Sequence, residues 1–489
     1  MKTFYDLLKE LNPDLKVELD KNFVLTPQKT FTYHSVNQLC SHAAESLRRL
    51  GVAKHSLVPI LLDNSSDFII AVFSLWMLEA IPVPINIKLS SSEIKTQLDF
   101  LKCKRIIVGS STKDLIGTNH LQQINFETLK QTIDEIDIDF AFDKNRTAIV
   151  LFTSGSSGKP KVVELTFSSL INSAKIGNEF LKQTKHDCWL TSLPFYHIGG
   201  FSIIFRALMF GTQIIIPDNL KTNSLHSSIH LFKPTLISLV SSQMKELLNN
   251  NIRPNENLRY VLLGGGFIDS SLMREALSKG WNVCKVYGST ETSSFVTVLS
   301  SEEFALKPES AGKPIQPNEI FIVDENGNEL PPNTEGEIAV KSPALMKGYL
   351  HDLSTTKQKP KSGLYFTGDI GYKDQDGYLF ILNRRNDLIV TGGENVNPNE
   401  VEKIILKFPN VKEVCVFGID DDKWGQKVAA AIVTNPDQQF TLEELKAFMK
   451  DKIAAFKIPK EIYFVDELPK TELGKVRPAE IKNLLGLIS

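Results

Sequence analysis

The 489-residue chain has little of what marks a nucleic-acid-binding or disulfide-stabilised protein. Its 55 lysines and arginines are balanced by 57 aspartates and glutamates, so the net charge of −2 gives no electrostatic reason to bind nucleic acid or an anionic membrane. Five cysteines are scattered, with no pair at C-x-x-C spacing, which argues against a zinc site and a disulfide framework. These absences favour a globular protein of the reducing cytoplasm, with two to four domains at this length.

Long hydrophobic runs are also missing. The first twenty residues alternate charged and apolar side chains and lack the continuous apolar core of a signal peptide. The most hydrophobic segment, residues 68–78, is well short of the ~20 residues needed to cross a bilayer. We therefore predict that this segment is a buried helix of the core.

Short apolar runs of strand type recur through the first half of the chain. Amphipathic stretches such as 35–51 and 269–280 lie between several of them. Because strands that alternate with helices are typical of parallel sheets, we expect an α/β fold. The predicted strands lie at 57–62, 81–87, 105–109, 147–153, 212–217, 236–240 and 260–265.

The pattern changes after about Gly312. Residues 320–340 and 370–382 are typical of hairpins, with turns at "ENGN" and "DQDG". A compact α+β set follows beyond a cluster of charges and glycines at 383–402. We place a domain boundary near Arg385, which gives an N-terminal domain of 1–384, including a β-rich subdomain, and a C-terminal domain of 385–489. Two such parts predict a ligand cleft between them.

The stretch 151–166, "LFTSGSSGKPKVVELT", concentrates hydroxyls, glycines and lysines. It is not a Walker A loop, because Pro160 follows Lys159 and position 153 is threonine where that motif needs glycine. Its glycines still expose backbone N–H groups, and its hydroxyls and Lys159 could wrap a polyphosphate. A polar loop between a strand and a helix explains the same composition equally well.

Five motifs in order resemble the adenylate-forming superfamily of acyl-CoA synthetases, nonribosomal adenylation domains and firefly-type luciferases. The motifs are "FTSGSSGKPK", "YGSTE", "YFTGDIGY", "NRRNDLIVTGGENVNPNEVE" and "PKTELGKVR", and they cover essentially the whole chain. Further segments, among them "SLPFYHIGGFSIIFRALMFG" and "LMKGYL", look like those of the o-succinylbenzoate–CoA ligases of menaquinone biosynthesis.

This resemblance implies a large α/β N-terminal domain, a small mobile C-terminal domain and two half-reactions in one cleft. A carboxylate attacks the α-phosphate of MgATP, and the thiol of coenzyme A then displaces AMP from the acyl adenylate. The small molecules implied are the acid, ATP, Mg²⁺ and coenzyme A. We expect no nucleic-acid partner and no membrane span, whereas the oligomeric state stays open and includes a homo-oligomer.

The resemblance also assigns the nucleotide site. It implies that Glu291 binds Mg²⁺, that Thr290 contacts the α-phosphate and that Tyr287 stacks on adenine. The loop beginning at Thr153 should hold the β- and γ-phosphates, while a glycine run should line the adenine and acyl slots. The remaining residues assigned to these places are Ser154, Gly155, Ser156, Ser157, Gly158, Lys159, Gly264, Gly265, Gly266, Gly288 and Ser289, with Gly265 and Gly288 also facing the acid.

Asp369 is expected to accept hydrogen bonds from both ribose hydroxyls, which suits a bidentate acceptor. Arg384 follows as a second ribose or phosphate ligand, and Asn386 occupies the hinge position. Two departures stand out: Val162 replaces a common glycine, and Asn383 stands where an aspartate often precedes the arginine.

Three more roles come from the resemblance. Lys475 should be the catalytic lysine of adenylation, because a point charge between carboxylate and α-phosphate stabilises the transition state. Gly392 and Gly393 should admit the pantetheine thiol in the second conformation. His197 should stand beside the acyl pocket, counted with the catalytic residues, although a lone histidine after an apolar run is more often a core residue.

Arg206 is an arginine inside the apolar stretch "IIFRALMF". A buried guanidinium requires an anionic partner. That partner could be the carboxylate of o-succinylbenzoate that is not activated, or equally an internal aspartate or glutamate. Both readings stay open at this stage.

Other functions of the same superfamily are considered beside the o-succinylbenzoate ligase. One is another acyl- or aryl-CoA synthetase with a short or aromatic acid, which would differ only in pocket residues. A second is a carrier-protein-loading adenylation domain, but "PFYHIGG" offers no aspartate for a substrate ammonium group. A third is an inactive nucleotide-binding regulator, which the joint presence of Glu291, Asp369, Arg384 and Lys475 opposes.

Overall fold

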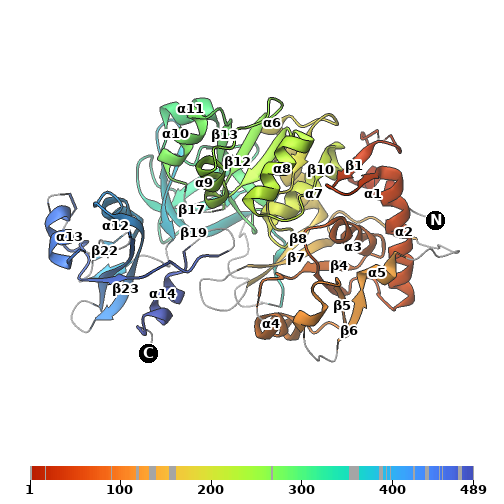
Figure 1. Ribbon diagram of the computed structural model, residues 1–489, viewed down its shortest axis with the longest axis horizontal. Coiled ribbons are helices and arrows are strands. Elements are labelled where there is room, and N and C mark those ends of the chain that lie inside the picture. The colour runs from red at the N-terminus through yellow and green to blue at the C-terminus, as the bar shows by residue number, and fades with distance from the viewer. Residues whose placement is uncertain are drawn as a thin grey trace.

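The fold is taken from a computed structural model. It describes residues 3–16, 18–89, 91–116, 121–130, 139–153, 161–265, 268–351, 363–384, 389–391, 394–396, 398–421, 425–435, 440–450, 452–453, 455–471 and 476–487. Figure 1 shows the N-terminal α/β elements at the right and centre and the C-terminal elements at the left.

A nine-stranded sheet forms the centre of the N-terminal part, in the order β15-β14-β13-β12-β11-β9-β10-β1-β2. Its inner strands from β1 to β13 are parallel, and the strands at both edges are antiparallel. The strands are β1 (Asn22–Leu25), β2 (Thr30–Thr32), β9 (Cys188–Leu190), β10 (Gln213–Ile215), β11 (Leu236–Leu239), β12 (Tyr260–Leu263), β13 (Val283–Ser289), β14 (Ser294–Leu299) and β15 (Lys313–Pro314). Helices α8 (Thr222–Phe232), α9 (Ser241–Asn249) and α10 (Ser270–Ser278) connect successive parallel strands, as the alternating pattern predicts.

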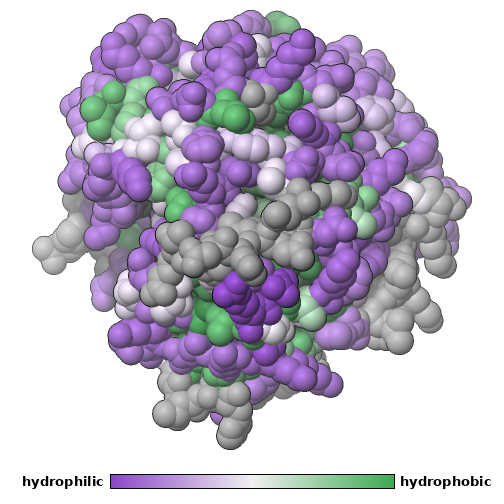
Figure 2. All heavy atoms as spheres, turned by 90° about the vertical axis from the view of Figure 1, so that its right-hand side faces the viewer, coloured by the Kyte–Doolittle hydropathy of each residue, from purple (hydrophilic) through white to green (hydrophobic). Residues whose placement is uncertain are grey.

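A second parallel sheet has the order β4-β3-β5-β6 and consists of β3 (Leu57–Leu61), β4 (Ile81–Pro84), β5 (Arg105–Val108) and β6 (Gln122–Asn125). Along the chain, these strands are preceded by, alternate with or are followed by five helices: α1 (Phe4–Leu11), α2 (Tyr33–Arg49), α3 (Ser66–Met77), α4 (Ser91–Leu101) and α5 (Phe126–Leu129). The outer face beside α1 and α2, seen in Figure 2, is mostly hydrophilic with scattered apolar residues. The face shown therefore gives no sign of a large apolar contact surface.

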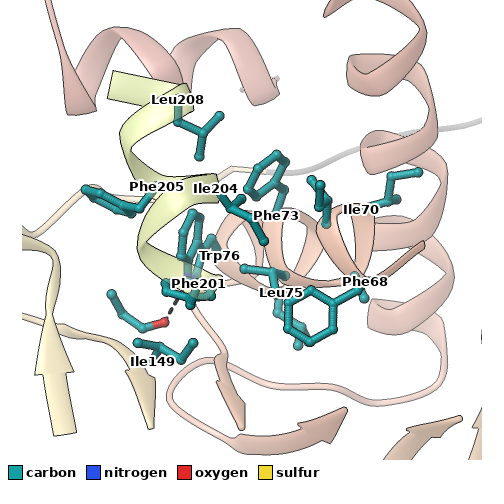
Figure 3. Packing of buried hydrophobic residues seen from close by; sticks show 14 of the residues in the cluster. Phe68, Ile70, Phe73, Leu75, Trp76, Ile149, Phe201, Ile204, Phe205 and Leu208 are labelled. Atoms are coloured by element: carbon teal, nitrogen blue, oxygen red, sulfur yellow. Dashed lines mark hydrogen bonds between the residues drawn. The ribbon is translucent and has the colours of Figure 1, made fainter. Parts of the chain in front are cut away.

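Helix α3 confirms the prediction of a buried core helix at 68–78. The Trp76 indole lies edge-on to the rings of Phe167, Phe201 and Phe205 and donates a hydrogen bond to the Ala148 carbonyl at 2.7 Å (Figure 3). This packing joins α3 to β7 (Thr147–Thr153), α6 (Phe167–Leu181) and α7 (Ile198–Phe210). Among the described residues, no helix is long and apolar enough to cross a membrane.

At 151–166 the chain does not pass directly from a strand into a helix, as one of our two interpretations of this stretch assumed. Strand β8 (Lys161–Thr166) follows the hydroxyl-rich loop and pairs antiparallel with β7, with Thr153 opposite Lys161, before α6 begins. A short third strand, β18 (Gly348–Tyr349), pairs with the other edge of β8. The prediction missed β8, which is short and whose second partner, β18, lies far along the chain. Val162, where the family often has glycine, is a buried residue of β8 opposite Phe152.

Both predicted hairpins are confirmed. Strand β16 (Glu319–Val323) pairs with β17 (Gly336–Lys341), and β19 (Leu364–Lys373) pairs with β20 (Leu379–Arg384). Because β17 also pairs with β19, the two hairpins form one antiparallel sheet of four strands. This sheet is the β-rich part that brings Asp369 of β19 to the site.

The C-terminal part is a separate α+β unit, as the fold prediction requires. Strands β21 (Ile389–Thr391), β22 (Glu394–Val396), β23 (Val411–Asp421), β24 (Gly425–Thr434) and β25 (Glu461–Phe464) form one sheet, with helices α12 (Pro398–Ile405), α13 (Leu442–Met449) and α14 (Pro478–Leu484). Asn399 of α12 donates a hydrogen bond to the Leu382 carbonyl of β20 at 2.8 Å. The boundary that we predicted near Arg385 lies outside the described residues and stays a prediction.

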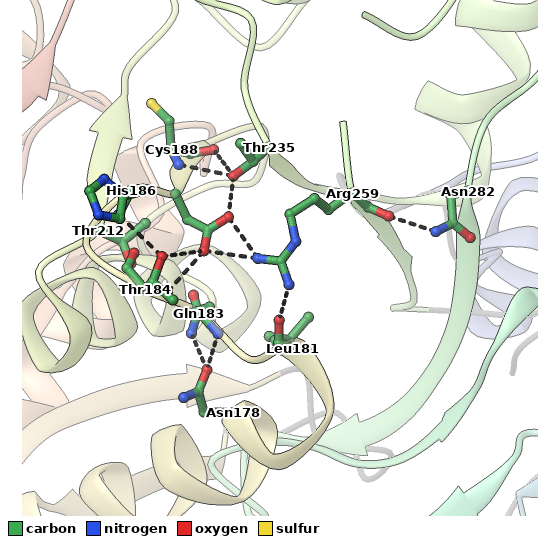
Figure 4. A network of polar contacts seen from close by, with 11 residues as sticks. Asn178, Leu181, Gln183, Thr184, His186, Cys188, Thr212, Thr235, Arg259 and Asn282 are labelled. Atoms are coloured by element: carbon green, nitrogen blue, oxygen red, sulfur yellow. Dashed lines mark hydrogen bonds and ion pairs between the residues drawn. The ribbon is translucent and has the colours of Figure 1, made fainter. Parts of the chain in front are cut away.

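A polar network fixes the strands of the large sheet relative to α6. The Nη1 group of Arg259 donates to both carboxylate oxygens of the buried Asp187, at 2.7 Å to Oδ1 and 2.8 Å to Oδ2. Its Nη2 group donates to the Leu181 carbonyl (Figure 4). Burial tends to raise the pKa of Asp187, but the hydrogen bonds from Arg259 and Thr235 outweigh it and hold the pKa below its usual range. The network ties together the segments that enter β9, β11 and β12, at the edge opposite their carboxyl ends.

Candidate active site

The carboxyl ends of parallel strands in an open α/β sheet are the usual place for ligands, and the predicted motifs follow β12 and β13. Gly264 and Gly265 follow β12 directly. A Cβ on Gly264 would lie 2.8 Å from Val286 Cγ2, and Gly265 has a φ of +87°, so neither position suits a larger residue. The run thus leaves bare backbone at the strand end, as predicted, while Gly266 lies outside the described residues.

Tyr287 of β13 and Asp369 of β19 lie in contact across two sheets. The tyrosine hydroxyl donates a hydrogen bond to Asp369 Oδ2 at 2.8 Å, and the Asp369 side chain is largely buried. The register of β19 and β20 places Arg384 directly opposite Asp369. Three residues that we assigned to adenine and ribose therefore converge on one place, although the Arg384 side chain lies outside the described residues.

The turn after β13 carries the predicted phosphate and metal residues. The Ser289 N–H donates to Thr292 Oγ1 at 2.8 Å, and the Ser293 N–H donates to the Thr290 carbonyl at 3.0 Å. The Ser289 hydroxyl is buried and has no hydrogen-bond partner among the described residues. A buried hydroxyl without a partner is costly, so this one is available to a ligand.

Glu291 lies within that turn and is held by a residue that sequence reasoning did not select. Tyr349 of β18 donates a hydrogen bond to Glu291 Oε1 at 3.0 Å, and the Met346 N–H donates to the Glu291 carbonyl at 2.8 Å. Tyr365 of β19 lies beside Tyr349, and burial together with the nearby Glu291 raises the pKa of Tyr365 far above its usual range. In the sequence, the one pointer to this contact with Glu291 is Tyr349 itself, as part of the segment "LMKGYL" that resembles the family.

Thr153 marks one end of the predicted phosphate loop. Its hydroxyl donates to the Lys161 carbonyl at 3.3 Å across the β7–β8 pair. Two antiparallel strands therefore flank the loop, which differs from a loop that opens a helix. The loop itself, with Ser154, Gly155, Ser156, Ser157, Gly158 and Lys159, lies outside the described residues.

His197 stands immediately before α7, with its ring 4.8 Å from that of Tyr196. Burial, and secondarily the charge of Lys88, lowers the pKa of His197 to about 4. The imidazole is therefore neutral at physiological pH. Such a residue can pack against an acid or accept a hydrogen bond, but it does not supply a positive charge.

Arg206 of α7 lies in the interior, only 2% exposed. Its Nη1 donates to the Ser202 hydroxyl at 2.9 Å, and its guanidinium stacks on the rings of Phe295, at 4.7 Å, and Trp189, at 5.8 Å. Its Nε and Nη2 groups have no hydrogen-bond partner among the described residues. Burial lowers the pKa of Arg206 to about 9. The described residues thus provide no internal carboxylate for it, which was one of our two readings.

Four further predicted positions, Asn386, Gly392, Gly393 and Lys475, lie outside the described residues. Their roles remain those implied by the motifs.

Comparison with known proteins identifies the class to which this fold and site belong. Residues 14–350 match the model of the AMP-binding enzymes, and residues 400–475 match that of the AMP-binding enzyme C-terminal domain. The chain belongs to the AMP-binding enzyme family.

Among its relatives is the 2-succinylbenzoate–CoA ligase of Geobacillus sp. (strain WCH70), which is 35% identical over 458 residues, 93% of this chain and 92% of that protein. The o-succinylbenzoate CoA synthetase of Bacillus subtilis in complex with its acyl-adenylate intermediate has a TM-score of 0.90 and 33% identity, covering 99% of this chain and 98% of that one. The same enzyme in complex with ATP and a magnesium ion has a TM-score of 0.89 and 32% identity, covering 98% of this chain and 99% of that one.

The donor set fits a magnesium ion that arrives with a nucleotide. Among the described residues, no group of three or more histidine, cysteine, aspartate or glutamate side chains could hold a metal by itself. Mg²⁺ is commonly bound through one or two carboxylates together with substrate phosphates and water, and not in a cage made by the protein alone. Glu291, a single carboxylate within the turn that follows β13, meets that requirement.

Proposed function

We propose that the chain is an ATP-dependent acid–CoA ligase that converts o-succinylbenzoate, ATP and coenzyme A into o-succinylbenzoyl-CoA, AMP and diphosphate. The observation that carries this proposal is the match along nearly the whole chain to 2-succinylbenzoate–CoA ligases, including a structure with the acyl adenylate bound. The convergence of Tyr287, Asp369 and Glu291 in one place supports the nucleotide half of the reaction.

The chemistry requires activation because a carboxylate is a poor acyl donor, whose leaving group would be oxide. Attack of the carboxylate on the α-phosphate expels diphosphate and gives an acyl adenylate, a mixed anhydride. AMP is then a good leaving group for the thiol of coenzyme A. Magnesium, when bound, supplies positive charge to the phosphate oxygens.

The residues divide this work between binding and charge stabilisation. Tyr287 packs against the adenine, Asp369 accepts from the ribose hydroxyls, and Glu291 holds the metal with the phosphates. Thr290 and the buried Ser289 hydroxyl donate toward phosphate oxygens. Lys475 brings a positive charge to the attacking carboxylate, and rotation about Asn386 exchanges it for the Gly392–Gly393 segment in the thioester step.

The substrate has a second carboxylate that is not activated, and we assign it to Arg206. The guanidinium is buried, charged at neutral pH and has two N–H groups without partners among the described residues. Arginine binds carboxylates in a planar, often bidentate geometry. We place His197 beside the aromatic ring of the acid, as a neutral residue.

We also propose that the enzyme acts in the cytoplasm on small molecules, with no nucleic-acid partner. No disulfide joins the five cysteines, four of which are buried, and this suits a reducing compartment. The state of assembly, including a homo-oligomer, is left to measurement by light scattering.

The test is release of diphosphate from ATP and Mg²⁺ with o-succinylbenzoate, benzoate, hexanoate and several amino acids, each with and without coenzyme A. We expect strong turnover with o-succinylbenzoate alone and formation of its CoA thioester. A preference for benzoate or hexanoate would keep the mechanism but replace the acid, and a preference for an amino acid would indicate an adenylation domain. If no acid releases diphosphate, the inactive regulator becomes the better reading.

A Lys475→Ala variant separates the two half-reactions. We expect adenylation to fall by at least 100-fold, because the charge at the transition state is lost. Thioester formation from added acyl adenylate should be much less affected. Full adenylation activity in this variant would contradict the role given to Lys475.

A further inference from the structure

Tyr349 lies at a junction of three parts of the site, yet no motif assigns it a role. Tyr349 is only 8% exposed, and its hydroxyl donates a hydrogen bond to Glu291 Oε1 at 3.0 Å. An ionised carboxylate can only accept hydrogen bonds, so the tyrosine must be the donor. The bond leaves Oε2 of the same carboxylate for another ligand.

The segment that carries Tyr349 also fixes the backbone around Glu291. The Met346 N–H donates to the Glu291 carbonyl at 2.8 Å, and the Ser293 hydroxyl donates to the Ala344 carbonyl at 2.6 Å. Main chain and side chain of Glu291 are therefore both held by residues 344–349. With the backbone fixed and one carboxylate oxygen bound, the Glu291 side chain has little freedom to change its rotamer.

The ring of Tyr349 reaches the strand that leaves the phosphate loop. Lys161, the first residue of β8, places its Nζ 5.2 Å from the centroid of this ring. The backbone adds to this contact, because Tyr349 is opposite Val163 in the β18–β8 pair and the Leu350 N–H donates to the Val162 carbonyl at 2.7 Å. Tyr349 thus links the exit of the loop to Glu291.

Tyr365 completes the arrangement from the opposite side. It is 5% exposed and lies beside Tyr349 and Glu291. Tyr365 belongs to β19, the strand that carries Asp369. One chain of contacts therefore connects the ribose strand, the metal carboxylate and the strand that follows the loop.

We propose that Tyr349 is a positioning residue that holds Glu291 in the orientation needed for Mg²⁺, and that Tyr365 in turn holds Tyr349. This inference rests on the proposed function, because it assumes that Glu291 ligates the metal of MgATP. Mg²⁺ demands near-ideal octahedral geometry, so a loosely held carboxylate binds it poorly. Removal of a hydrogen-bond partner behind a metal ligand typically costs 10–100-fold in metal affinity or activity.

The test is a Tyr349→Phe variant of the full chain, which keeps the ring and removes the hydroxyl. Binding of Mn²⁺, in the presence of α,β-methylene ATP, is followed by electron paramagnetic resonance, which does not depend on turnover. We expect the dissociation constant of Mn²⁺ to rise about 10-fold or more. In turnover assays, the Mg²⁺ concentration for half-maximal rate should rise similarly, while the KM for o-succinylbenzoate changes less than threefold.

Tyr378→Phe is the matched control. Tyr378 is also buried, 7% exposed, and its hydroxyl donates at 3.3 Å to a glutamate, Glu303, to which we assign no part in metal binding. This variant should bind Mn²⁺ as the wild type does. A loss of metal affinity in both variants would mean that general destabilisation causes the effect, and it would overturn the proposal.

Tyr365→Phe keeps the proposal testable if Tyr349→Phe does not fold. It leaves the bond to Glu291 in place and removes only its support, so we expect a rise of about 3- to 10-fold in the Mn²⁺ dissociation constant. Unchanged metal binding in Tyr349→Phe, or in Tyr365→Phe when only that variant folds, would refute the inference. A wild type that binds Mn²⁺ with the ATP analogue but does not turn over o-succinylbenzoate would refute the substrate assignment alone.

Discussion

Replacement of Arg206 by methionine should stabilise the unliganded protein while it damages binding of the diacid. The guanidinium is buried with one hydrogen bond, to Ser202, and two aromatic contacts. Burial lowers the pKa of this group from 12.5 to about 9. Since one pKa unit corresponds to about 1.4 kcal/mol, the charged form costs the unliganded fold on the order of 5 kcal/mol at neutral pH.

Methionine removes that cost but also the contacts that offset part of it. The hydrogen bond to Ser202 contributes about 1 kcal/mol, and the two cation–π contacts contribute about 1 kcal/mol each. The net gain in the free energy of unfolding is then about 2 kcal/mol, within the range seen when buried charges are replaced by apolar side chains. For a chain of this size we expect Tm without ligand to rise by roughly 2–4 °C.

Binding should change in the opposite direction. Two charge-assisted hydrogen bonds to the substrate carboxylate are worth at least about 1.5 kcal/mol each, so their loss should raise the KM for o-succinylbenzoate by on the order of 100-fold. The KM for ATP should stay within about threefold. Differential scanning fluorimetry and the coupled diphosphate assay measure the two effects on the same preparation.

Arg146 provides the matched control for this experiment. It is also a buried arginine with a cation–π contact, to Phe167 at 4.7 Å, and with two nitrogens, Nε and Nη1, that have no hydrogen-bond partner among the described residues. Arg146→Met should leave the KM for the diacid unchanged. If Arg206→Met lowers Tm, or raises the KM of ATP and diacid equally, Arg206 is a structural residue and the reasoning is wrong.

Two further predictions concern His197 and Gly288. The folded-state pKa of His197, about 4, is below its unfolded value of 6.5, so this residue contributes stability above pH 6.5 that is lost as the pH falls toward 4. The Tm of the wild type should therefore fall more steeply than that of His197→Gln across that window; parallel curves would argue against a buried neutral imidazole. A Cβ at Gly288 would lie 2.1 Å from the Ser294 carbonyl oxygen and 2.5 Å from Phe295 Cα, so Gly288→Ala should lose about 3 kcal/mol of stability or more. The control is Gly199→Ala, where the nearest atom is the movable Leu193 Cδ1 at 3.1 Å, and its Tm should change by no more than about 2 °C. Thermal and urea melts of the two variants measure the difference, and equal losses of stability in both would contradict the argument.

Elements that are determined by local patterns could be predicted from the sequence. The apolar run at 68–78 became α3, and the turns "ENGN" and "DQDG" became the hairpin connections in which Gly327 and Gly377 have φ values of +84° and +82°. Glycine tolerates such values and other residues rarely do, which is why the turns are visible in the sequence. The parallel α/β arrangement was predictable for the same reason, from alternating patterns along the chain.

Contacts between distant segments could not be predicted in this way. Strand β8 is six residues long, and although β7 lies just before the phosphate loop, its other partner, β18, is a segment almost two hundred residues later. The hydrogen bond from Tyr349 to Glu291 joins residues 58 positions apart. No local periodicity specifies such a pair, so the tyrosine in "LMKGYL" was seen only as part of a family resemblance.

Arg206 shows why a residue type can reveal a site before its partner is known. The sequence indicated a buried cation in an apolar helix and left two partners open. Within the described part of the chain the structure supplies a hydroxyl and two aromatic rings, but no carboxylate. Those contacts offset only part of the cost of burying the charge, so the guanidinium is incompletely satisfied by the described residues. If Arg206 binds the substrate as we propose, a dicarboxylic acid meets that requirement and a monocarboxylic acid does not, so the buried charge would select substrates by their second carboxylate.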